Sequence, residues 1–214
     1  MCRSCASKLV YVRQPLCMKC GKELSDENQE YCRDCLHKKH LYDRGISLYR
    51  YASVKKAVYR FKYAGRQEYA AFFGKEMAWH LGRQILSWKV DALVPVPLHP
   101  ARKRKRGYNQ AEVIARKISE ALGGVAVRTD ILVRSHYTRT QTKLGVLAKS
   151  DNVHGAFALR RETAAQVSGC RHILIVDDVF TTGATMGACI CMLQTFFDVN
   201  VRISCATLGY VTSG

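Results

Sequence analysis

Two adjacent carboxylates stand at the end of an apolar stretch, in a chain that is otherwise strongly basic. In the segment ILIVDDVFTTGAT, four apolar residues from Ile173 onward lead directly into Asp177 and Asp178. We expect this segment to form a buried strand, a turn and then a helix that begins near Ala184. Carboxylates in this position can accept hydrogen bonds from vicinal sugar hydroxyls, directly or through a divalent metal ion. The pair therefore predicts a site for a ribose diol.

The turn that follows the carboxylates predicts an anion site. The N-terminus of a helix presents backbone N–H groups without helical partners and attracts negative charge. Threonine hydroxyls add donors, and a glycine lets the backbone come close to a ligand. The residues expected to hold a phosphate are Thr181, Thr182, Gly183, Ala184 and Thr185. A phosphate beside a ribose diol corresponds to a 5-phosphoribosyl group.

A run of cations follows the predicted strand that ends near Pro97. The run consists of Arg102, Lys103, Arg104, Lys105 and Arg106. We expect an exposed loop, because five like charges repel one another unless anions neutralise them. The loop falls on the ligand side of the predicted sheet, so it would bind a diphosphate, a nucleic-acid backbone or both. A merely solvated loop is the alternative. Beside it, Tyr108 and Asn109 would stack on and hydrogen-bond a base.

A second basic and aromatic stretch runs from Tyr59 to Arg66. Helical spacing makes Tyr59 and Tyr63 neighbours on one face of a helix. The two rings would either belong to a surface that binds a nucleic-acid strand or pack in the core. The sequence leaves both interpretations open.

The cysteines indicate a metal site. Six of the ten cysteines lie in the first 35 residues as three C-x-x-C pairs, in a chain whose start has no apolar signal-peptide segment. Two such turns supply four thiolates, which suits a structural, tetrahedral zinc ion. The favoured ligands are Cys17, Cys20, Cys32 and Cys35. The pair Cys2 and Cys5 could replace one of these pairs, stay idle, or belong to a ribbon whose usual start is missing.

The overall composition limits the partners and the location. There are 34 basic and 17 acidic residues, a formal net charge of +17. This excess favours a polyanionic partner such as nucleic acid, a phosphorylated small molecule or an anionic membrane surface. The apolar runs are shorter than the ~18 residues of a membrane span. We therefore expect a cytoplasmic protein without a membrane span.

Residues 1–40 are expected to form a cysteine-rich, zinc-ribbon-like module, and residues 41–214 a second domain. The predicted strands of that domain cover 45–52, 90–98, 131–133, 172–179 and 201–210, and the predicted helices cover 54–66, 67–87, 108–122 and 184–197. This alternation predicts an α/β fold with a doubly wound, mostly parallel sheet that is covered on both faces. In such folds ligands bind beyond the carboxyl ends of the strands.

The segment VDDVFTTGAT resembles the phosphoribosyl-diphosphate (PRPP) motif of type I phosphoribosyltransferases, and the chain from residue 17 to 210 resembles the ComF family. Further matching segments are VPVPLHPARKRKRGYNQAEVIAR, RSHYTRTQTKLG and NVHGAF. The resemblance implies that Asp177 and Asp178 contact the ribose hydroxyls and that the threonine turn holds the 5′-phosphate. It also implies that pyrophosphate binds after Pro97, and that residues 134–150 form a mobile hood.

Three interpretations of function follow from these patterns. The first is a ComF-like accessory protein of DNA uptake, natural transformation or DNA utilisation, which binds a PRPP-like ligand and single-stranded DNA. The alternative is an active Mg²⁺-dependent phosphoribosyltransferase, in which Asp177 and Asp178 hold the sugar while the cations and Mg²⁺ stabilise the leaving pyrophosphate. The residues do not identify the nitrogen acceptor or decide whether turnover occurs. A zinc-dependent scaffold that docks a DNA-uptake helicase is a third interpretation.

Overall fold

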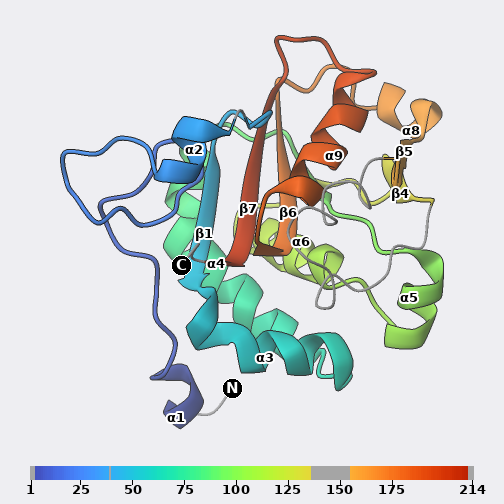
Figure 1. Cartoon of the computed structure of the whole chain (residues 1–214). Coiled ribbons are helices and arrows are strands. Elements are labelled where there is room, and N and C mark those ends of the chain that lie inside the picture. Colours follow the sequence, from blue (N-terminus) through green and yellow to red (C-terminus); the bar gives the residue numbers. More distant parts are fainter. Residues whose placement is uncertain (1–2, 39, 136–154, 212–214) are drawn as a thin grey trace.

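The computed structural model describes residues 3–38, 40–135 and 155–211, and its centre is a five-stranded parallel sheet (Figure 1). The strands are β1 (Gly45–Arg50), β2 (Ala92–Pro95), β3 (Ala126–Val127), β6 (His172–Phe180) and β7 (Arg202–Tyr210). Their order across the sheet is β1-β7-β6-β2-β3, and every neighbouring pair is parallel. The predicted α/β fold with a parallel sheet is confirmed.

The strand order reverses between β2 and β6. From β2 the chain builds toward the β3 edge, whereas from β6 it builds toward β7 on the opposite side. The register places Pro95 beside Val176, and the Val96 N–H donates to the Val176 carbonyl at 2.9 Å. The chain after β2 and the carboxylates of β6 therefore emerge side by side at a topological switch point, where ligands bind in open α/β sheets.

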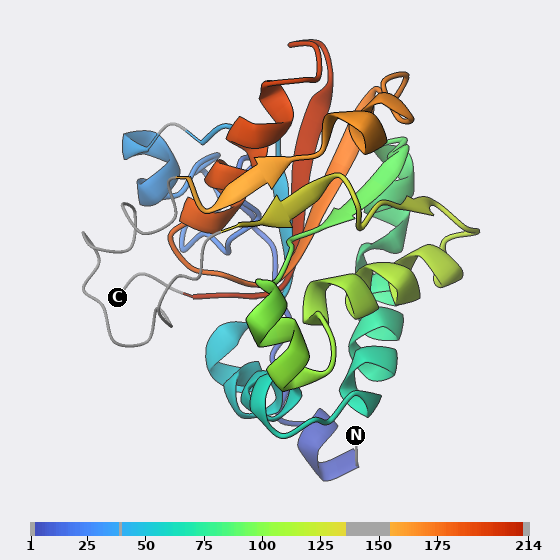
Figure 2. The ribbon, with the colours of Figure 1, turned by 90° about the vertical axis from the view of Figure 1, so that its right-hand side faces the viewer.

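Both faces of the sheet are covered (Figure 2). One face packs against helices α3 (Tyr51–Tyr63), α4 (Glu68–Ser87) and α6 (Gln110–Ala121). The other packs against α9 (Ala184–Gln194), α8 (Arg161–Ala165) and a hairpin of β4 (Leu132–Arg134) and β5 (Phe157–Leu159). Strand side chains alternate between the faces, so Leu174 and Val176 join the first core and Ile173 and Ile175 the second. The near-continuous apolar run before Asp177 follows from this double burial.

The N-terminal module contains α1 (Arg3–Ala6) and α2 (Arg33–His37) and packs directly on the α/β sheet. The Val12 N–H donates to the Leu48 carbonyl, and the Arg50 N–H donates to the Val10 carbonyl, each at 2.9 Å. The first cysteine turn lies against the start of β1. The predicted boundary at residue 40 stays a prediction, but hydrogen bonds cross it.

One element was predicted wrongly and another was misplaced. The cationic run is not a loop but helix α5 (Pro100–Arg106). Its helical conformation has local causes: Pro100 occupies the first turn, the His99 side chain accepts from the Ala101 N–H at 3.2 Å, and Gly107 ends the helix at a φ of 84°. The strand predicted at 131–133 exists as β4, but it pairs antiparallel with β5 outside the main sheet. The predicted helices 54–66, 67–87, 108–122 and 184–197 are confirmed, with ends shifted by a few residues.

Candidate functional site

A cavity of about 700 Å³ opens at the carboxyl ends of β2 and β6. Its wall comes from the end of β6, the turn before α9, helices α3, α5 and α6, strand β4 and the N-terminal module. Among the described residues, seven cationic side chains line it, against three carboxylates. The cations are Lys22, Lys38, Lys55, Lys62, Arg102, Arg106 and Arg134, and the acids are Asp34, Asp177 and Asp178. The cavity is therefore suited to a small polyanion.

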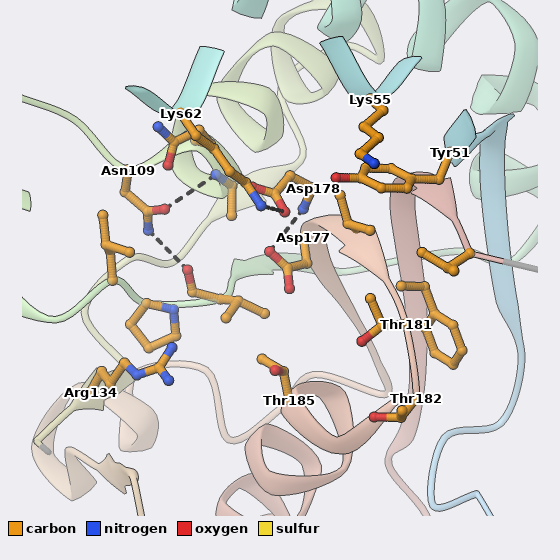
Figure 3. A pocket seen from close by; sticks show the side chains of 18 of the residues that line it. Tyr51, Lys55, Lys62, Asn109, Arg134, Asp177, Asp178, Thr181, Thr182 and Thr185 are labelled. Atoms are coloured by element: carbon orange, nitrogen blue, oxygen red, sulfur yellow. Dashed lines mark hydrogen bonds and ion pairs between the residues drawn. The ribbon is translucent and has the colours of Figure 1, made fainter. Parts of the chain in front are cut away.

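Asp177 and Asp178 lie at the centre of this cavity (Figure 3). The Asp178 N–H donates to Oδ1 of Asp177 at 2.8 Å, and Oδ1 of Asp178 pairs with the Lys62 ammonium at 2.7 Å. Burial, and secondly the charge of Asp178, raises the pKa of the Asp177 carboxyl from 3.8 to about 7. The site therefore holds one ion-paired carboxylate and one carboxyl that titrates near neutrality.

The predicted phosphate turn is present at the start of α9. Gly183 has a φ of 80°, and a Cβ there would lie 3.0 Å from the Phe180 ring, so the backbone conformation and the tight contact both favour glycine. The predicted side chains that line the same cavity as the carboxylates are Thr181, Thr182 and Thr185 (Figure 3). Ala184 is the first residue of α9, and its backbone N–H donates to the Thr182 hydroxyl oxygen at 3.4 Å. The structure thus brings together the carboxylates and the hydroxyls of the turn.

The cationic run is divided by its helical conformation. Arg102 and Arg106, one turn apart, both line the cavity, whereas Lys103 pairs with Glu112 at 3.1 Å. Arg106 donates to Oε1 of Gln110, and burial lowers its pKa. Arg104 and Lys105 do not line this cavity. Two cations of the run, Arg102 and Arg106, therefore line the cavity, and the binding of a diphosphate or of nucleic acid by the run stays a prediction.

Tyr108 does not present a ring to a base. Its side chain is 5% exposed, packs against Phe61 with ring centroids 5.5 Å apart, and donates its hydroxyl to the Phe61 carbonyl. Asn109 lines the cavity, but its side chain caps α6 by accepting from the Ala111 N–H and donates to the Val96 carbonyl at 2.9 Å. Asn109 thus fixes the chain after β2 to α6, and base stacking at Tyr108 is ruled out by its burial.

Helix α3 contributes residues that the sequence analysis did not assign to the cavity. Lys55 and Lys62 lie about two helical turns apart and both face it (Figure 3). Their i, i+7 spacing, which places two lysines on one face of a helix, was the signal available in the sequence. Tyr59 and Tyr63 are instead 64% and 53% exposed, with ring centroids 4.9 Å apart. The predicted helical pair is confirmed, and the alternative that it packs in the core is wrong.

Four cysteines form a cluster in the N-terminal module. The sulfur atoms of Cys17, Cys20, Cys32 and Cys35 all lie within 4.8 Å of one another. Four convergent thiols fit tetrahedral zinc and leave no open position for catalysis. Cys5 is exposed and outside this cluster, and Cys2 lies outside the described residues. The cluster suggests a structural zinc ion held by the predicted ligands.

The predicted hood at 134–150 lies almost entirely outside the described residues.

Fold and site together define an α/β protein with a parallel sheet, a polyanion-suited cavity and a four-cysteine zinc module. Residues 1–36 match the double zinc ribbon domain family. The chain is 29% identical over 209 residues to the DNA utilization protein YhgH of Salmonella typhimurium, covering 96% of this chain and 88% of that protein. It is 27% identical to competence protein F of Haemophilus influenzae, covering 87% and 80%, and 27% identical to competence protein ComFC of Bacillus subtilis, covering 91% and 78%.

These similarities to competence protein F, ComFC and the DNA utilization protein YhgH confirm the resemblance to the ComF family. Among solved structures, a purine phosphoribosyltransferase from Pyrococcus horikoshii matches with a TM-score of 0.39 and 14% identity, covering 66% of this chain and 83% of that one. Across the described residues, no helix has both the length and the apolar character required to cross a membrane.

Proposed function

We propose that this chain is a cytoplasmic accessory protein of DNA uptake or DNA utilisation that binds a 5-phosphoribosyl ligand such as PRPP together with Mg²⁺. The observation that supports this proposal is the single cavity that Asp177, Asp178 and the threonine turn share at the β2–β6 switch point. A sugar diol and a phosphate five or six bonds apart would both find partners there.

The residues divide the ligand between them. The backbone N–H of Ala184 and the turn hydroxyls would hold the 5′-phosphate, as helix N-termini do. Asp177 and Asp178 would accept the ribose hydroxyls, and Arg102 and Arg106 would face the pyrophosphate. When bound, Mg²⁺ would neutralise part of the diphosphate charge beside these carboxylates.

Calorimetry with PRPP and Mg²⁺ tests the pocket. Asp177→Asn and Asp178→Asn combined should weaken binding by about 100-fold, because two charge-assisted hydrogen bonds are lost. The matched control Asp198→Asn alters an exposed loop and should bind as the wild type does. Ribose 5-phosphate should also bind about tenfold more tightly than 2-deoxyribose 5-phosphate, which lacks one hydroxyl. An unchanged affinity in the double variant, or no binding by the wild type, would contradict the proposal.

The surface formed by Tyr59, Tyr63 and Arg106 supports a second part of the proposal, which is binding of single-stranded DNA. The two exposed rings lie together, and the Arg106 guanidinium lies 5.3 Å above the Tyr63 ring, so cavity and surface are contiguous. Stacking on exposed aromatic rings beside cations is typical of strand binding without sequence preference. Arg104 and Lys105 extend the positive charge along α5.

Fluorescence anisotropy of a labelled oligonucleotide tests this surface. Replacing Tyr59 and Tyr63 by Ala should weaken binding by about 10-fold or more, since each stacked base contributes ~1–3 kcal/mol. Trp79→Ala removes an exposed ring from α4 and is the control. Replacing Arg104 and Lys105 by Ser should reduce the slope of log affinity against log salt by about 1.4, since each phosphate contact on a single strand contributes about 0.7. Equal affinities in the tyrosine and tryptophan variants would refute this assignment.

An active Mg²⁺-dependent phosphoribosyltransferase is the alternative function. Arg102 and Arg106 lie on the cavity wall where a leaving pyrophosphate would depart, which favours this reading of the same site. Pyrophosphate release from PRPP across a panel of nitrogen bases is the test, and release that depends on Asp177 would establish turnover. A DNA-uptake helicase stays a predicted partner, and its binding requires a pull-down with the purified proteins.

A further inference from the structure

The N-terminal module forms part of the wall of the ligand cavity. Its residues on that wall include Lys22, Asp34 and His40. The sequence alone predicts a separate zinc-binding module. In the folded chain it faces the same space as Asp177 and the phosphate turn.

His40 joins the module to the phosphate turn. Its Cε1 lies 3.6 Å from the position of a Cβ built on Gly183, so the imidazole is directly beside the turn. The ring stacks on Tyr42, with centroids 4.9 Å apart, and meets the Phe180 ring edge-on at 6.3 Å. Tyr42 and Phe180 belong to the core cluster that includes Cys17. Burial and neighbouring lysines lower the pKa of His40, so at neutral pH the ring supports the turn by packing.

Lys22 brings a buried charge to the same end of the cavity. Its side chain is 8% exposed, and its ammonium lies 2.7 Å from Oδ2 of Asp34 and 5.8 Å from the centroid of the Phe180 ring. An ammonium has three N–H donors, so one carboxylate partner leaves donors for an anion in the cavity. A poorly hydrated cation over the ring of Phe180, the residue before the turn, favours a dianionic phosphate monoester.

We propose that the zinc module completes the phosphate end of the phosphosugar site, with Lys22 supplying charge to a phosphate monoester and His40 positioning the Thr181–Gly183 turn. This inference rests on the proposed function, because it assigns two further residues to the same ligand. It makes the module a structural part of the binding site in addition to any contact with other macromolecules.

A narrower role for Lys22 is to balance the zinc site. Four thiolates around Zn²⁺ carry a formal charge of −2, and Lys22 follows Cys20 by two positions while pairing with Asp34 of the other knuckle. The two roles make different predictions. A residue that serves only the metal site changes zinc retention, whereas a residue of the ligand site changes phosphate affinity at full zinc occupancy.

The test measures two quantities on the zinc-loaded full chain: the affinity for ribose 5-phosphate by calorimetry and the zinc content by mass spectrometry. Lys22→Met should weaken binding about tenfold with zinc retained, which is the effect of losing one charge-assisted contact. Lys22→Arg should restore most of the affinity. Arg33→Met removes an exposed cation from the same module and is the matched control, with no expected change.

His40 is tested by a pair of substitutions. His40→Ala should weaken binding by about threefold to tenfold because the turn loses its packing partner, and His40→Phe should restore binding because a ring is kept. The inference would be overturned if Lys22→Met and His40→Ala bound ribose 5-phosphate as tightly as the wild type. It would also be overturned if the variants lost affinity only in proportion to the zinc they had lost. If the wild type itself binds no ribose 5-phosphate, the proposed function fails first and the inference fails with it.

Discussion

The ion pair between Lys62 and Asp178 allows a test of the electrostatics inside the cavity. The two charged atoms lie 2.7 Å apart, with the side chains 24% and 11% exposed. Lys62→Met keeps most of the side-chain length and removes the charge, which leaves Asp178 beside the carboxyl of Asp177. Breaking a fully buried pair costs ~3–5 kcal/mol, and the partial exposure of Lys62 reduces this to about 2 kcal/mol of unfolding free energy. For a chain of this size the melting temperature should fall by about 4–8 °C.

The pKa shifts give the pH dependence of this loss. Burial alone would lower the pKa of Lys62, but the ion pair with Asp178 raises it overall. The stabilisation is therefore fully present below the unfolded pKa of about 10.5 and is lost as the pH rises through the folded value. In the variant, the two carboxyl groups remain close without the Lys62 ammonium, and protonation relieves their repulsion. We expect the difference from the wild type to be smaller near pH 5 than near pH 8.

Urea unfolding of the zinc-loaded protein provides the assay. Lys56→Met, an exposed lysine on the same helix, is the control and should change the unfolding free energy by less than about 0.5 kcal/mol. A double-mutant cycle of Lys62→Met with Asp178→Asn should give a coupling of about 1–2 kcal/mol. Additive effects in the cycle, or a Lys62→Met variant as stable as the control, would refute the reasoning.

Three further predictions concern the module and the carboxyl pair. Gly21→Ala would place a Cβ 2.4 Å from the Gly45 carbonyl oxygen, at a φ of 69°. We therefore expect the free energy of unfolding, measured by thermal denaturation, to fall by about 2–3 kcal/mol. Gly169→Ala is the control and should be neutral, because its new Cβ meets no neighbouring atom within 4 Å. Zinc analysis should find about one ion per four-cysteine cluster, and chelation of that ion should lower the melting temperature. The Cys5→Ser variant should keep the ion. A Cys5→Ser protein without zinc would disprove the ligand set. The pKa of Asp177 is about 7, and a bound diol or Mg²⁺ favours its ionised form. The affinity for PRPP should therefore rise from about pH 6 to about pH 8, and binding should release a proton. An affinity that calorimetry finds unchanged over this pH range would count against this.

Local sequence signals determined much of the fold and the centre of the site. The apolar run, the carboxylate pair and the Thr-Thr-Gly turn lie within 13 consecutive residues, Ile173 to Thr185, so strand, turn and helix follow from short-range preferences. The C-x-x-C spacing likewise predicted the four-cysteine cluster. Helix α5 was missed for a local reason as well. The prediction gave charge repulsion more weight than the start signal at Pro100 and the stop signal at Gly107.

The remaining walls of the cavity depend on long-range packing. Lys62 meets Asp178 only because α3 packs across the ends of the strands, and no spacing in the sequence relates two positions that are more than 100 residues apart. Tyr108 is removed from the surface by its contact with Phe61, which is also distant in sequence. His40 reaches Gly183 because the module packs against β1 and the core beneath Phe180.

The sequence by itself therefore determined the chemical groups of the candidate site: two carboxylates, a hydroxyl-rich turn, a set of cations and four thiols. Only the tertiary structure decided which cations face the carboxylates, that Tyr108 is buried, and that the cysteine module shares the cavity. The physical reason is that residue type and local periodicity fix each element and its apolar face. The neighbours of a side chain depend instead on how those faces pack, and this packing brings together residues from opposite ends of the chain.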